Sequence, residues 1–147
     1  MPDFDAIATA VALRFAAANM TAPGTYEAVR YSTANLPNNI GLTPCALTYL
    51  DEGSFETGNG TRQGSHNLIV RFYFSSGIDL ARDMAALRAW LTVLVGQLRT
   101  SVQLGGTVTY ARIDSWKFGL LSYAGDSFTG IELGVHVVTD EGWAASA

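Results

Sequence analysis

The sequence contains few of the residue types that many enzymes and metal sites require. Among 147 residues there is one cysteine, Cys45, together with two histidines and one lysine. A single cysteine excludes an intramolecular disulfide, and no local Cys/His spacing suggests a zinc site. Nine basic and thirteen acidic residues give a net charge of −4. A general nucleic-acid groove, which needs clustered Lys and Arg, is therefore not expected.

Long apolar runs are also missing. No stretch approaches the ~20 apolar residues that span a bilayer, and the N-terminus lacks a basic segment followed by an apolar one. We therefore expect one soluble globular domain over residues 1–147, made in the cytoplasm and without a membrane partner. Charged residues make up only 15%, against roughly 25% in average domains. This favours a surface partly covered by other protein, although a neutral surface of Thr, Ser, Asn and Gly would give the same figure.

Apolar spacing predicts two helices. Phe4, Ile7, Val11 and Phe15 recur at helical intervals and predict a helix from Asp3 to about Met20. A longer stripe predicts a second helix over residues 79–99; it consists of Leu80, Met84, Leu87, Leu91, Leu94, Val95 and Leu98. Trp90 and Val93 lie off this stripe, so we expect them to contact the first helix or a partner chain.

Alternating apolar residues predict four strands, over residues 45–50, 66–74, 108–118 and 131–138. Pro, Gly and Asn are dense in residues 21–44, which predicts a long irregular loop. Glycines in residues 51–65 predict a long hairpin with a mobile tip, and residues 119–130 are expected to connect the last two strands. This order predicts an α+β fold with a mostly antiparallel four-stranded sheet and two helices packed on one face.

No catalytic constellation is found in the sequence. There is no G-x-S-x-G motif, and Ser65-His66 has no partner that would make it part of a triad. The segment Gly58-Asn59-Gly60-Thr61 lacks the lysine and the following helix of a phosphate-binding loop, and is better explained as a turn. We therefore expect a protein that is not an enzyme and uses no cofactor or metal.

Candidate contact residues lie on strands and on the hairpin. Arg112 and Asp114 alternate with aromatic residues such as Tyr110 and Trp116, which predicts a half-buried contact face on one strand. The alternative is a bulge near Ile113 that exchanges the two faces. Three hairpin residues complete the candidate interface, as part of an arm that orders on docking: Phe55, Glu56 and Arg62.

The segment GGTVTYARIDSWKFGLLSYAGDSFTGIELGVHVVTDE, residues 105–141, resembles the tail terminator proteins of long-tailed bacteriophages. The resemblance centres on a turn of the form Y-x-G-x-x-[YF]-x-G-[IV]-x-[LF], matched by Tyr123, Gly125, Phe128, Gly130, Ile131 and Leu133. Residues 71–94 are similar to the aromatic strand and amphipathic helix upstream in that family. Together these segments cover about half of the chain. The 21–44 segment and the glycine-rich hairpin depart from the family pattern.

The resemblance implies an α+β protomer without catalysis that forms a homohexameric ring on the finished tail tube. Such a ring would stop polymerisation of the tail tube protein, present a surface to the head completion or connector protein, and let DNA pass through its lumen. The protein would then reside in the virion, at the head-proximal end of the tail. The family supplies no invariant motif from which interface residues could be transferred to this sequence.

Two other functions fit the sequence. The first is a head–tail joining or minor tail protein of the same fold group, which would bind a different partner. The second is a small-ligand-binding or hydrolytic domain with a pocket under the 21–44 loop. In that case His136 and Asp114 would supply the polar groups of the pocket.

Overall fold

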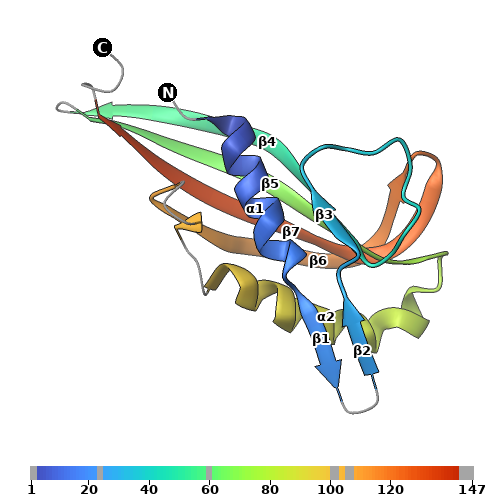
Figure 1. Ribbon diagram of the computed structural model, residues 1–147. Helices are drawn as coiled ribbons and strands as arrows, with labels where there is room; N and C mark the ends of the chain where they lie inside the picture. The colour runs from blue at the N-terminus through green and yellow to red at the C-terminus, as the bar shows by residue number, and fades with distance from the viewer. Residues whose placement is uncertain (1–2, 23–24, 59–60, 100–102, 105–107, 143–147) are drawn as a thin grey trace.

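The structure is a computed structural model that describes residues 3–22, 25–58, 61–99, 103–104 and 108–142 of the chain (Figure 1). Its elements, in chain order, are α1 (Phe4–Ala16), β1 (Asn19–Ala22), β2 (Thr25–Ala28), β3 (Tyr31–Thr33), β4 (Cys45–Gly58), β5 (Thr61–Ser76), α2 (Leu80–Arg99), β6 (Tyr110–Tyr123) and β7 (Asp126–Gly142). Neither described helix combines the length and apolarity that crossing a bilayer requires.

The main sheet has five strands in the order β3-β4-β5-β7-β6, and β1 and β2 form a separate two-stranded hairpin. Among the described strands of this sheet, only the β3–β4 pair is parallel, and the other three pairs are antiparallel. An α+β fold with a mostly antiparallel sheet is thus confirmed. The expected count of four strands is wrong, because residues 21–44 contain β3, which pairs Tyr31 with Cys45. A three-residue strand is too short to show an apolar alternation of its own.

Both helices pack on one face of the main sheet. Asp3 begins α1 by accepting a 3.0 Å hydrogen bond from the backbone N–H of Ala6, as an N-cap residue does. Helix α1 packs against β3 and β4, and α2 packs against β6 and β7 (Figure 1). The core between helices and sheet is continuous and includes Ile7, Val11, Phe15, Leu68, Val70, Phe72, Leu87, Trp90, Leu94, Ile131, Leu133 and Val135.

The predicted position of Trp90 off the apolar stripe of the second helix is wrong. Trp90 is 0% exposed, and its ring centroid lies 4.9 Å from that of Phe72 on β5. Leu91, which the predicted stripe placed in the core, is only half-buried, and Val93 is half-buried against the same core. The buried side of α2 is formed by Asp83, Leu87, Trp90, Leu94 and Leu98. Apolar residues occupy two sides of this helix, so periodicity alone does not select the side that meets the sheet.

The long hairpin predicted over residues 51–65 is formed, and its described residues, 51–58 and 61–65, belong to strands β4 and β5. β4 and β5 remain paired as far as Gly58 and Thr61, and β7 pairs with β5 over the same stretch. Of the predicted mobile tip, Glu56, Thr57 and Arg62 belong to these paired strands, and residues 59–60 lie outside the described residues. Two glycines of this region make room for the buried His66 ring: a Cβ on Gly53 would lie 2.4 Å from Nδ1, and one on Gly64 would lie 2.6 Å from Nε2. The role of these two glycines is therefore close packing around the His66 ring.

Residues 119–130 are also mostly strand. β6 extends to Tyr123 and β7 begins at Asp126, so only Ala124 and Gly125 connect the two strands. These two residues have φ values of 52° and 87°. Successive positive φ values match the twist of a two-residue antiparallel hairpin. The turn matched by the family pattern is therefore a tight hairpin between two long strands.

A second, smaller core lies on the other face of the sheet. It consists of Cys45, Leu47, Tyr73, Leu121 and Phe128, with partly buried neighbours that include Ile40 and Tyr123. The Tyr123 hydroxyl donates a hydrogen bond to the Pro37 carbonyl, which fastens the segment after β3 to the β6–β7 hairpin. Cys45 is buried in this smaller core, and its burial raises the pKa of its thiol.

Candidate protein-binding edge

Strand β6 forms one edge of the main sheet. Its fourteen residues pair with β7 on one side, and no described strand pairs with its other side. The outward backbone N–H and C=O groups of such a strand can accept another chain. Of its side chains, Tyr110, Trp116 and Leu120 are large, apolar and exposed. This combination makes β6 the strongest candidate for a functional surface.

A bulge interrupts β6 at Asp114. The register with β7 shifts between Ile113 and Ser115. Before the bulge, Ala111 and Ile113 lie opposite core residues of β7; after it, Trp116 and Phe118 occupy that same face. The bulge expected as an alternative near Ile113 is therefore confirmed. The continuous face shared by Arg112, Asp114 and Trp116 is not formed.

A groove lies beside the bulge on the helix face, between β6 and the C-terminal half of α2. Its volume is about 290 Å³. Trp116, a residue that is 55% exposed, forms one wall, and its ring centroid lies 5.1 Å from that of Phe118. The remaining lining combines apolar side chains with charged groups at the rim: Val95, Leu98, Ile113, Arg99 and Arg112. An apolar side chain from another molecule could pack against the apolar residues of this groove, with charged residues close by.

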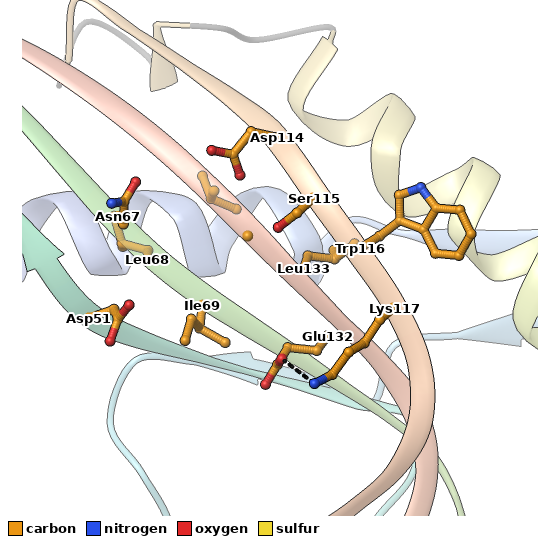
Figure 2. A pocket seen from close by; sticks show the side chains of 12 residues that line it. Asp51, Asn67, Leu68, Ile69, Asp114, Ser115, Trp116, Lys117, Glu132 and Leu133 are labelled. Atoms are coloured by element: carbon orange, nitrogen blue, oxygen red, sulfur yellow. Dashed lines mark ion pairs between the residues drawn. The ribbon is translucent and has the colours of Figure 1, made fainter.

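A second groove lies on the opposite face of the sheet, with a volume of about 350 Å³. Figure 2 shows Asp114 and Asp51 at two sides of this groove, and Trp116 pointing away from it. Glu132 lies between two cations: its Oε1 is 2.9 Å from Arg71 Nε, and its Oε2 is 3.5 Å from Lys117 Nζ. The bulge of β6 thus lies between two grooves of mixed lining, one on each face of the sheet.

The structure brings only two of the residues predicted for the interface to this edge. Arg112 and Asp114 are exposed at the bulge. Trp90 is in the core, and Val93 packs partly against it. Phe55 lies near the far end of β4, where its ring contacts those of Phe4 and His66 at centroid distances of 6.5 and 5.3 Å.

The two remaining candidates lie in the β4–β5 hairpin. The backbone of Glu56 pairs with Gln63, and that of Arg62 pairs with Thr57, so both belong to strands. Their side chains lie outside the described part of the structure. Trp116 was predicted to lie on a contact face of this strand, whereas the groove beside α2 was missed, because the position of a helix across the sheet depends on contacts between distant segments.

The residues described by the structure do not include a group of three or more His, Cys, Asp or Glu side chains placed to hold a metal ion. His136 Nδ1 lies 3.0 Å from Asn67 Oδ1 on the polar face of the sheet. A pocket beside the 34–44 segment is lined by residues such as Ile40 and Thr43, and neither His136 nor Asp114 contributes to it. Among the described residues, the pocket beside this loop therefore does not contain the two polar groups that the sequence analysis assigned to it.

No protein-family model matches this sequence, and a search of curated proteins finds no match. The surface of β6 is thus the basis on which a function can be proposed.

Proposed function

We propose that this protein is a structural virion subunit that assembles with copies of itself into a ring capping a phage tail tube. The ring would end polymerisation of the tube and offer the docking surface for the head connector. The observation that carries this proposal is the edge of β6 that no described strand pairs with, where Trp116 is exposed between two grooves. A long edge strand with exposed aromatic residues can pair with another chain unless a helix or loop covers it.

The composition of this edge supports a protein partner. Interfaces are enriched in Trp, Tyr and Arg, and the residues that contribute most to binding are drawn from the same three types. Tyr110, Arg112 and Trp116 occur within seven consecutive residues of β6, and all three are exposed. Only 15% of the residues are charged, so few charged side chains solvate the surface. This low charge also favours coverage of the surface by another protein.

The resemblance to tail terminator proteins points to the same part of the chain. The resembling segment, residues 105–141, includes all of β6 and most of β7, which meet in the tight turn at Ala124 and Gly125. The segment thus contributes the open edge and its supporting strand. In the proposed role the protein acts through its surface, and DNA passes through the ring without being bound.

The experiment is a tube-assembly assay with the tail tube protein encoded by the same genome. We expect the chain to halt tube growth at substoichiometric amounts and to appear as ring-shaped density at one tube end in negative-stain images. Trp116→Ala should reduce both effects, and Arg88→Ala, which changes an exposed residue of α2, should leave them unchanged. Binding to connector complexes with no effect on tubes would instead support a head–tail joining role. Binding to neither would contradict the proposal.

A further inference from the structure

We propose that the β6 edge of one copy docks against the outer edge of β4, over residues 50–55, of the next copy. This inference rests on the proposed self-assembly and adds which two surfaces meet.

The outer edge of β4 is the second open edge of the sheet. β3 pairs with β4 only from Cys45 to Leu47, and no other described strand pairs with β4 on that side. Six consecutive residues, from Leu50 to Phe55, are exposed. β4 and β6 are separated by β5 and β7, so one copy can use both edges at once.

The two edges carry opposite charge. β4 contains Asp51, Glu52 and Glu56 and no basic residue, a net charge of −3. β6 contains Arg112 and Lys117 against Asp114, a net charge of +1. Arg99 of α2 adds a further positive charge in the groove beside β6. Opposite potentials favour the β4–β6 contact, and like charges disfavour contacts between two β4 or two β6 edges.

The two edges also offer apolar surface of matching kind. On β4, Leu50 is 46% exposed and Phe55 is 39% exposed. On β6, Trp116 and the groove toward α2 provide an apolar hollow with charged residues at its rim. Burial of Leu50 or Phe55 against Trp116 would remove apolar area of both copies from water. The hydrophobic effect would then contribute to the free energy of association.

A β4–β6 contact determines the kind of assembly. Because the two surfaces differ, each bound copy leaves one β4 edge and one β6 edge open for the next copy. Such head-to-tail contacts continue until rotation closes them into a ring. A contact between two identical β6 edges would stop at a dimer. The inferred pairing is thus the one that a ring-forming subunit needs.

The test uses two charge-reversed variants of the full chain. Arg112→Glu changes the net charge of β6 from +1 to −1. The double variant Asp51→Lys/Glu52→Lys changes that of β4 from −3 to +1. In either variant alone, like charges meet at every β4–β6 contact. In an equimolar mixture, copies that alternate around the ring meet only opposite charges.

Sedimentation velocity and mass photometry, with and without tail tubes, measure the association. We expect each variant alone to self-associate about tenfold more weakly than the original chain, or worse, and the mixture to recover association. Association of the original chain should weaken as salt rises. Controls with the same charge change at exposed sites elsewhere, Arg88→Glu and Asp126→Lys/Asp140→Lys, should associate normally. Circular dichroism verifies that each variant is folded.

The outcomes separate this inference from the proposed function. If the original chain assembles and neither variant is impaired, or if the mixture fails to recover, the β4–β6 pairing is wrong while self-assembly stands. If the original chain only forms dimers, the head-to-tail contact is wrong. If it stays monomeric at every concentration and on tubes, self-assembly itself is wrong, and the inference falls with it.

Discussion

Asp83 Oδ2 accepts a 2.7 Å hydrogen bond from the Thr129 hydroxyl, which joins the first turn of α2 to strand β7. Both side chains are buried, and 46 residues separate them in the sequence. Arg82 forms two further hydrogen bonds with the Asp83 carboxylate, at 2.9 and 3.0 Å. The position of the long helix on the sheet therefore depends in part on one buried charged group.

This carboxylate gives the stability a defined pH dependence. Hydrogen bonds from Arg82 and Thr129 lower the pKa of Asp83 below its ordinary value of 3.8, although burial acts in the opposite direction. Because the pKa is lowered in the folded state, the contribution of Asp83 to the free energy of unfolding is present above pH 3.8 and is lost as the pH falls through the pKa of the folded state.

Asp83→Asn should lower the free energy of unfolding at pH 7 by about 1–3 kcal/mol. Urea denaturation at pH 7 and pH 3 measures this, and the difference from the original chain should shrink at pH 3. Asp126→Asn, at the exposed first residue of β7, is the control.

Two tryptophans should separate folding from assembly. Trp90→Ala removes a fully buried ring next to Phe72 and should destabilise the fold by about 3–5 kcal/mol. Trp116→Ala removes a mostly exposed ring and should change stability by much less, about 0.5 kcal/mol, while weakening self-association. Chemical denaturation and sedimentation velocity on both variants provide the comparison. Equal losses of stability in the two variants would show that Trp116 belongs to the fold and not to an interface.

The Thr48 hydroxyl offers a stabilising substitution. Thr48 lies on β4 beneath the helix layer and is buried, and its Oγ1 finds no hydrogen-bond partner among the described residues. Thr48→Val keeps the shape and removes a buried polar group, so the free energy of unfolding should rise by about 1 kcal/mol. Thr129→Val is the matched control: it should destabilise, because the Thr129 hydroxyl is bonded to Asp83. Denaturant midpoints measured side by side decide the matter, and a destabilised Thr48→Val would contradict the assignment.

Two glycines opposite each other on β6 and β7 should respond differently to alanine. A Cβ on Gly130 would lie 2.2 Å from the Phe72 carbonyl oxygen, a backbone atom that moves only if the strand moves. Gly130→Ala should therefore cost about 1–3 kcal/mol. Gly119, its cross-strand partner, has open space where a Cβ would be, so Gly119→Ala should leave stability nearly unchanged or slightly raised. Thermal melting curves of the two variants, compared with the original chain, test this asymmetry.

The sequence predicted the main elements where periodicity is strong and local. The apolar residues from Phe4 to Phe15 and from Leu80 to Leu98 located both helices, because they recur every three or four positions, as the residues on one side of a helix do. Alternation likewise located part of β4, β5, β6 and β7. Strand lengths were underestimated wherever glycine intervened. Gly53 and Gly64 resembled loop residues, although they are needed to accommodate the His66 ring.

The candidate site was predicted only in part. Arg112 and Asp114 were predicted on a strand that also carries Tyr110 and Trp116. For that strand the sequence allowed two alternatives, a continuous contact face or a bulge near Ile113. Whether Trp90 or Trp116 is exposed could not be decided, because both belong to patterns that fit either surface or core. The groove beside Trp116 involves Val95 and Leu98, which are near β6 only because α2 packs across the sheet.

By itself, the sequence determined the α+β class, the two helices, and a surface low in charge, because these follow from composition and from repeats within single segments. Only the tertiary structure decided the fifth strand, the burial of Trp90, and the open edges of β4 and β6. Each of these depends on which segments become neighbours. A short strand such as β3 and the exposure of an indole are settled by pairing and packing over long separations, for which a local pattern carries no signal.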